Sequence, residues 1–131
     1  MTDTMPTPVD GPHLRTVAMP RDTNPSGAIF GGWTLSQMDL AGAIVAAERA
    51  GGRVVTVSVD AMKFLRPIAV GDEVSCFATI EEEHPHSVAV RIETWARTRG
   101  TGGEAEKVTQ GVYTYVALGE DGKPRRIGPE G

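Results

Sequence analysis

One long helical segment limits what this chain can fold into. From about Gly32 to Arg49 the residues are small or favour helix, and apolar side chains occur on nearly every helical face. Such a helix is expected to be covered on all sides, and a rise of roughly 1.5 Å per residue makes it about 25 Å long. Gly51 and Gly52 end it. The rest of the chain must therefore cover one helix that is long enough to cross a sheet.

The segments around this helix change to a period of two residues, which is typical of strands with one covered face. Val55, Val57 and Val59 alternate with polar residues. Met62 and Phe64 then carry the apolar side chains on the opposite parity, which indicates either a bulge or a face that is covered in turn. Further strands are predicted at 14–19, 74–82, 87–98 and 108–118.

The order of one strand, one long helix and four strands favours an α+β fold. No βαβ alternation is visible, so we expect an antiparallel β-sheet wrapped around one long central α-helix. A length of 131 residues corresponds to one domain, predicted at 13–127 between a flexible N-terminal tail (1–12) and a C-terminal tail (128–131). A single-layer sheet leaves open edges and a partly exposed helix, which favours pairing with a second copy of the chain.

Composition argues against several classes of function. The formal net charge is −4 and the cations are scattered, so a large duplex-binding surface is not expected, although a small polyanionic ligand fits. The first residues lack the pattern of a secretory signal, and no run approaches the roughly 20 apolar residues that span a bilayer. Cys76 is the only cysteine, which excludes an internal disulfide and fits a reducing compartment. We expect a cytoplasmic protein with neither nucleic-acid binding nor membrane insertion.

One acidic residue, Asp39, interrupts the apolar helix. A carboxylate in an apolar setting is costly, so it is retained chiefly where it is paired, hydrated at a cavity or performing chemistry. Just upstream, Gly31 and Gly32 lead into the helix, whose free N–H groups can stabilise a developing oxyanion. Asp39 could then act as general base or as nucleophile. The structural alternatives are an acid bonded to a neighbouring loop and a glycine pair that only permits a tight turn.

The other candidate groups indicate neither a metal site nor a nucleotide fingerprint. Gly27, Gly31 and Gly32 fit neither a Walker loop nor the G-x-G-x-x-G spacing. Cys76 is expected to be a small core residue. The histidines lie outside the helix without zinc-like pairing and are expected at the surface: His13, His84 and His86.

Several segments, taken together in their order and spacing, resemble the hotdog-fold acyl-CoA thioesterases of the YciA type. The similarity runs from roughly Leu14 to Ile127, nearly the whole chain. The segments that carry it are Thr23-Asn24-Pro25-Ser26-Gly27-Ala28-Ile29-Phe30-Gly31-Gly32-Trp33, Ser36-Gln37-Met38-Asp39, Val54-Val55-Thr56-Val57-Ser58-Val59 and Phe64-Leu65-Arg66-Pro67.

The resemblance implies hydrolysis of acyl-CoA to a free acid and CoA, without metal or redox cofactor, by dimers that assemble into hexamers as trimers of dimers. It implies that Asp39 is the catalytic carboxylate and that Asn24 is a second catalytic group. It also implies that the Gly31 and Gly32 donors and Asp39 come from different subunits. The substrate contacts predicted with it are Phe30, Trp33, Arg66 and Ser87.

Two other functions stay open at this point. A hotdog hydratase or dehydratase usually needs a histidine paired with an acid, and no histidine lies on or just before this helix. A non-catalytic acyl-CoA sensor would use the same pocket, but such proteins generally carry a separate regulatory segment, for which this chain has no room. The presence of both Asp39 and Asn24 also favours catalysis.

Overall fold

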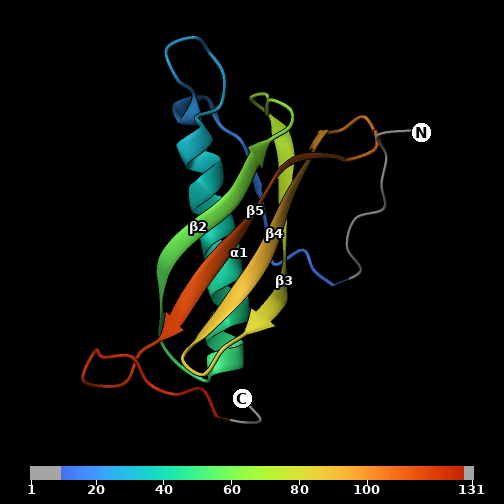
Figure 1. Cartoon of the computed structure of the whole chain (residues 1–131). Helices are drawn as coiled ribbons and strands as arrows, with labels where there is room; N and C mark the ends of the chain where they lie inside the picture. The colour runs from blue at the N-terminus through green and yellow to red at the C-terminus, as the bar shows by residue number, and fades with distance from the viewer. Residues whose placement is uncertain (1–9, 129–131) are drawn as a thin grey trace.

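A single antiparallel sheet with one long helix on its face makes up the fold (Figure 1). The computed structural model describes residues 10–128, so most of the predicted N-terminal tail (1–9) and residues 129–131 of the C-terminal tail lie outside the described residues. The helix is α1 (Gly31–Ala50), and a short 3-10 helix, η1 (Pro20–Asp22), precedes it. The strands are β1 (Leu14–Val17), β2 (Val54–Phe64), β3 (Asp72–Glu83), β4 (Ser87–Thr98) and β5 (Glu106–Ala117).

The strands lie in the order β1-β3-β4-β5-β2, and each neighbouring pair is antiparallel. This arrangement confirms the predicted α+β class and the sheet wrapped around one helix. The sheet has β1 at one edge and β2 at the other, so one side of β2 faces no strand among the described residues. In Figure 1 the helix lies behind the sheet and crosses its concave face.

The helix ends where glycine allows a left-handed residue. Gly51 has φ of +73°, and its N–H donates to the carbonyl of Ala47 at 2.8 Å. At the other end Phe30 is the N-cap residue, and its side chain makes no capping bond. The predicted helix of 32–49 was therefore right to within one residue at each end.

The core lies between α1 and the strands β3, β4 and β5. Met38 and Ala41 of the helix pack there against strand residues such as Ile92. Tyr113 and Tyr115 of β5 are almost fully buried and stack with ring centroids 6.3 Å apart. Alternate residues of a strand share one face, which places both rings against the helix.

Strand β2 contains the bulge that the change of parity predicted. Its register with β5 shifts between Thr56 and Ser58 and again between Asp60 and Lys63. Ala61, inside the second shift, has φ of +52°. Such irregularities re-aim side chains, and here they carry β2 around the helix toward its N-terminus.

One face of the helix lacks the cover that its apolar character predicted. Leu40 and Ile44 are more than half exposed in the single chain, although both are apolar. Val55, Val57 and Val59 of the neighbouring strand are also exposed. Val59 is paired with Tyr113, which faces the helix, whereas Val55 is paired with Val116, on the other side of the sheet. Leu40, Ile44 and Val59 are called the open face below.

We predict that Gly42→Ala destabilises the fold because the helix and β5 approach too closely at this point for a methyl group. A Cβ atom on Gly42 would lie near the Tyr115 hydroxyl and 2.6 Å from Ile92 Cδ1. Overpacking of a core typically costs about 1–3 kcal/mol. Urea unfolding should therefore show a lower free energy of unfolding for this variant.

The matched control is Gly32→Ala in the same helix, where a Cβ would contact nothing within 4 Å. Replacing a helical glycine by alanine should leave stability unchanged or raise it by roughly 0.5–1 kcal/mol. Equal stability of the two variants would contradict the close approach at Gly42.

Candidate active site

Hydroxyl groups from two strands hold the Asp39 carboxylate. Thr56 Oγ1 of β2 donates to Asp39 Oδ1 at 2.7 Å, and the Tyr115 hydroxyl of β5 lies 3.1 Å from the same oxygen. Thr56 and Tyr115 are opposite each other in the β2–β5 register, so one pair of facing strand positions supplies both donors. Both bonds reach Oδ1, and within residues 10–128 no hydrogen bond reaches Oδ2.

The carboxylate forms part of the wall of a cavity of about 230 Å³ between α1 and β2. Most of its wall is carbon, so a ligand here meets an apolar surface with one charged group. The lining residues are Leu35, Ser36, Asp39, Thr56, Val59 and Tyr113. Val59 belongs also to the open face, so the cavity reaches the free edge of the sheet.

The two tyrosines fix the helix at the level of Asp39. The Tyr113 hydroxyl donates to the Leu35 carbonyl at 2.8 Å, and the Tyr115 hydroxyl lies 3.0 Å from the Asp39 carbonyl. Burial raises the pKa of both phenols above their ordinary value, and the negative charge of Asp39 raises it further. Both groups therefore stay protonated and act as donors.

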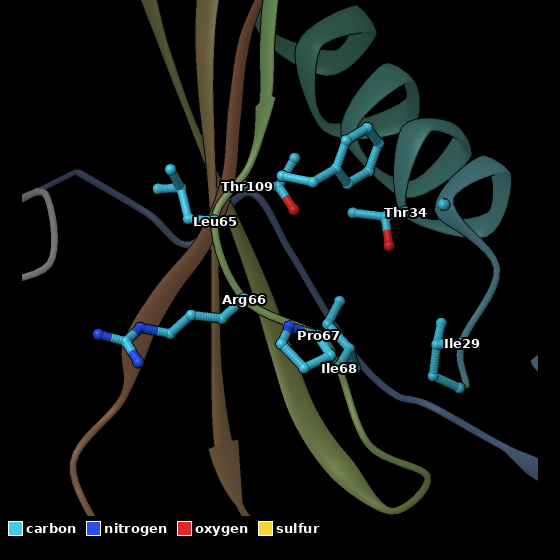
Figure 2. Close-up of a pocket in the computed structure, with 9 residues that line it drawn as sticks. Ile29, Thr34, Leu65, Arg66, Pro67, Ile68 and Thr109 are labelled. Atoms are coloured by element: carbon cyan, nitrogen blue, oxygen red, sulfur yellow. The ribbon is translucent and has the colours of Figure 1, made fainter. Parts of the chain in front are cut away.

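A second cavity, of about 280 Å³, lies at the N-terminus of α1 (Figure 2). The chain that follows β2 forms one wall, and the helix start forms the other. Its lining residues are Ile29, Gly31, Thr34, Phe64, Leu65, Arg66, Pro67, Ile68 and Thr109. Asp39 does not line this cavity, and Gly31 does not line the first one.

The glycines at the helix start present backbone donors. The Phe30 carbonyl accepts from the N–H groups of Trp33 and Thr34, whereas within the described chain the N–H groups of Gly31 and Gly32 find no acceptor. A side chain on Gly32 would meet nothing within 4 Å, so the approach to these donors is open. Seven residues separate Gly32 from Asp39, which corresponds to about 10 Å along the helix. One subunit therefore does not bring both groups to the same carbonyl.

Asn24 organises the loop that leads into the helix. Its Oδ1 accepts from the backbone N–H groups of Ser26 at 2.9 Å and Ala28 at 3.1 Å. Gly27, inside this turn, has φ of +89°, which an L side chain rarely adopts. The carbonyl end of the amide is thus committed to the loop, and Asn24 lines neither of the two cavities. The catalytic role of Asn24 remains a prediction.

The predicted substrate contacts lie in different places. Phe30 is half exposed beside the helix start, and Trp33 packs against the second core cluster, which includes Ile68. Arg66 lines the second cavity, and its guanidinium lies 3.7 Å from Glu106. In Figure 2 this side chain extends away from the cavity.

Ser87 begins β4 at the other end of the sheet, near the C-terminal end of the helix. Arg49 in the last turn of α1 donates to Glu83 in the same region at 2.6 Å. One ligand can therefore meet Arg66 and Ser87 together only if they come from different subunits. The substrate-binding role of each of these four residues stays a prediction.

Sequence reasoning missed Thr56 and Tyr115, the residues that hold Asp39. The two tyrosines at alternate positions of one predicted strand could have indicated a polar partner for Asp39, because buried tyrosine hydroxyls generally form a hydrogen bond. Nothing in the sequence alone indicated that Thr56 would lie opposite Tyr115, since that pairing depends on the bulged register of β2.

Other titratable groups lie outside these cavities. Cys76 is buried beside Thr94, and burial raises its pKa to about 11, so it fits the predicted core role. His84 and His86 are exposed, whereas His13 is partly buried and its Nδ1 accepts from the Ala78 N–H at 3.0 Å. Across residues 10–128, no group of three or more His, Cys, Asp or Glu is placed to hold a metal ion. No helix of the described part is long and apolar enough to cross a membrane.

Comparison with known proteins places this geometry in a family. Residues 26–102 match the sequence model of the thioesterase superfamily. The acyl-CoA thioester hydrolase YciA of Salmonella typhimurium is 50% identical over 120 residues, which are 90% of each chain.

Two solved structures share the fold and much of the sequence. A hexameric hotdog fold thioesterase of Campylobacter jejuni superposes with a TM-score of 0.85 at 45% identity, covering 91% of each chain. A hexameric broad specificity acyl-coenzyme A thioesterase has a TM-score of 0.82 at 47% identity, covering 89% of this chain and 80% of the other. The predicted hotdog fold is thereby confirmed.

The tyrosine pKa values provide a test of the site geometry, because the chain contains only Tyr113 and Tyr115. In the folded protein both should remain protonated well above the ordinary tyrosine pKa of about 10. Unfolded chains ionise near that value, so stability is complete below about pH 10 and falls as the pH rises further. Absorbance of tyrosinate and urea unfolding measure the two effects.

Asp39→Asn should lower both tyrosine pKa values, because the carboxylate charge contributes to them. Asp60→Asn is the control, since Asp60 is an exposed carboxylate of β2 whose Oδ2 accepts from Ser58. Titration of the tyrosines near the ordinary value in the native protein would contradict their burial beside Asp39.

Proposed function

This chain belongs to the thioesterase superfamily and, within it, to the YciA acyl-CoA thioester hydrolases, and we propose that its reaction takes place at Asp39. The substrate is an acyl-CoA, and the products are a free carboxylic acid and CoA. The observation that carries the proposal is the carboxylate of Asp39, which two hydroxyls fix through Oδ1 while Oδ2 is left for water or substrate.

Asp39 acts on the thioester carbonyl in one of two ways. As general base, it takes a proton from the attacking water, so that hydroxide adds to the carbonyl carbon. As nucleophile, it forms a mixed anhydride that water then opens. In both routes the carbon–sulfur bond breaks, and the CoA thiolate leaves and takes up a proton. The donors Thr56 and Tyr115 hold the carboxylate in one orientation in either case.

The N–H groups of Gly31 and Gly32 stabilise the oxyanion that forms on the carbonyl oxygen. Preorganised backbone donors of this kind contribute about 3–4 kcal/mol of transition-state stabilisation in other enzymes. Because the two glycines lie about 10 Å from Asp39 along one helix, they serve the Asp39 of a second subunit. We assign to the NH₂ group of Asn24 the orientation of the water or the thioester.

The open face is where the second subunit binds. The face combines exposed Leu40 and Ile44 of the helix with exposed Val59 of β2, a strand whose outer edge has no neighbour in the described chain. Unpaired edges and contiguous apolar surface favour association. The cavity beside Asp39 reaches this face through Val59, so a partner here would complete the site.

The assembly, location and cofactor requirement belong to the same proposal. Two relatives are hexameric thioesterases, which supports a hexamer built as a trimer of dimers. The reaction uses no metal or redox cofactor, and the enzyme works in the cytoplasm. Phe30, Trp33, Arg66 and Ser87 contact the substrate, with Arg66 exchanging Glu106 for a CoA phosphate.

Asp39→Asn should abolish most of the activity because the amide neither accepts the proton of water nor forms an anhydride. Loss of a general base typically costs 10²–10⁴-fold. We expect kcat for butanoyl-CoA to fall by at least about 100-fold in a free-thiol assay. Asp60→Asn removes an exposed carboxylate from β2 and should retain activity. Normal turnover by a folded Asp39→Asn protein would defeat the proposal.

Ile44→Glu should separate the subunits, because it places a charge on an exposed apolar residue of the open face. Sedimentation should then show monomers, and kcat/KM should fall by at least about 100-fold since Asp39 loses the glycine donors of its partner. Val70→Glu changes an equally apolar, exposed residue outside this face and should keep both assembly and activity. Full activity from Ile44→Glu monomers would place the complete site within one subunit.

A further inference from the structure

We propose that the hydroxyl of Thr109 binds an amide of the pantetheine arm of CoA in the cavity at the N-terminus of α1. The inference rests on the proposed function. It adds a residue that binds the CoA portion, which all acyl-CoA substrates share. It does not depend on the chemical role of Asp39.

Thr109 carries a buried hydroxyl for which the protein provides no partner. The residue is 1% exposed on β5, and its Oγ1 forms no hydrogen bond within the described residues. Most buried polar groups are paired, and an unpaired one costs about 1–3 kcal/mol. Thr94, its register neighbour on β4, is equally buried, but its hydroxyl contacts Cys76 Sγ at 3.4 Å. The unpaired hydroxyl is therefore a feature of position 109 and not of buried threonines in this sheet.

This hydroxyl faces the second cavity. Figure 2 shows the oxygens of Thr109 and Thr34 both directed into the space between the chain after β2 and the helix start. The surrounding wall is mainly apolar and includes Ile29, Pro67 and Ile68. A ligand that fits is therefore a largely aliphatic chain with an isolated hydrogen-bonding group.

The pantetheine arm has this chemistry. Its two amides are separated by short methylene segments, and the first amide is joined to the sulfur through an ethylene group. Gly31 lines the same cavity and carries one of the free N–H groups. A thioester carbonyl bound at Gly31 would thus extend its pantetheine arm along the cavity toward Thr109. An amide can both donate to and accept from a hydroxyl, so it satisfies Thr109 in either orientation.

The acyl group is a poorer partner for Thr109. A simple acyl chain has no polar atom beyond the thioester, and a site built to bond one would reject unsubstituted acyl groups strongly. Broad specificity in one relative fits a hydrogen bond to the part that every acyl-CoA shares. Arg66 lies at the rim of this cavity, where the phosphates beyond pantetheine would emerge.

Thr109→Val tests the inference, because valine keeps the shape of threonine and removes only the hydroxyl. One neutral hydrogen bond corresponds to about a 3- to 10-fold change in affinity. Calorimetry should therefore show CoA itself binding about 3- to 10-fold more weakly. The kcat/KM for butanoyl-CoA should fall by the same factor, whereas hydrolysis of the butanoyl thioester of ethanethiol, which has no amide, should not change.

Stability supplies a readout that a structural role would not produce. Thr109→Val should keep or raise the Tm, because it removes an unpaired buried hydroxyl. Thr94→Val, the matched control, should lower the Tm by breaking the contact with Cys76 and leave CoA affinity unchanged. Weaker CoA binding together with a preserved Tm in Thr109→Val is the expected combination.

Three results would overturn the inference: unchanged CoA affinity in Thr109→Val, equal losses with and without the amide, or equal losses in Thr94→Val. A loss seen with 3-oxobutanoyl-CoA but not with butanoyl-CoA would also overturn it, by assigning Thr109 to the acyl group. CoA binding is measured without turnover. A wild-type protein that hydrolyses no acyl-CoA would therefore contradict the proposed function, whereas the effect of Thr109→Val on CoA affinity would still test this inference.

Discussion

The contact between Asp39 and the hydroxyls of Thr56 and Tyr115 is the interaction on which the rest of the structure depends. It places a charge in the middle of a helix that carries no other charged residue before Glu48, and a charge in such a setting is tolerable only with donors nearby. The donors come from strands that are far apart in sequence and adjacent in the sheet. They reach the helix because Gly42 leaves room for the Tyr115 ring. The position of the Asp39 carboxylate and the packing of helix on sheet are thus one constraint.

That constraint fixes one side of the helix and leaves the other side open. The side toward β3, β4 and β5 is filled by the core, whereas Leu40 and Ile44 are exposed. An apolar helix with one sheet over it is half covered, so the missing cover must come from another molecule. The same geometry separates Gly31 and Asp39 into different cavities. A second copy bound to the open face would cover the exposed helix residues and would bring Gly31 of one subunit to Asp39 of the other. Assembly and activity are therefore coupled in the proposed mechanism.

The local features of this fold were predictable because each depends on a short stretch of neighbouring residues. The helix was predicted from about Gly32 to Arg49, with Gly51 and Gly52 ending it. The change of apolar parity after Val59 indicated either a bulge or a covered face, and the structure shows the bulge. The 3-10 helix at Pro20–Asp22 was not predicted. The partners of Asp39 were not predictable, because they depend on a strand register that joins residues 17 and 76 positions away. Likewise, the separation of Arg66 from Ser87 follows from the sheet topology and from no local motif.

Some polar groups of the candidate site have hydrogen-bond partners within the chain, and others have none. In the proposed mechanism the first set fixes the geometry of the site and the second set binds the substrate. The chain bonds Asp39 Oδ1 and the Asn24 carbonyl internally, and both bonds fix the geometry of catalytic candidates. By contrast, the N–H groups of Gly31 and Gly32 and the Thr109 hydroxyl have no partner among the described residues, and two of these three residues line one cavity. The exposed N–H groups of Gly31 and Gly32 can bond water, whereas the unpaired buried hydroxyl of Thr109 lowers the stability of the free protein. The proposed substrate would pair all three groups. A thioester joined to an amide-bearing arm supplies those partners in the required order, oxyanion first and amide next. In the proposed mechanism, the unpaired groups at this cavity meet the substrate, whereas the bonds to Asp39 and Asn24 orient the catalytic candidates.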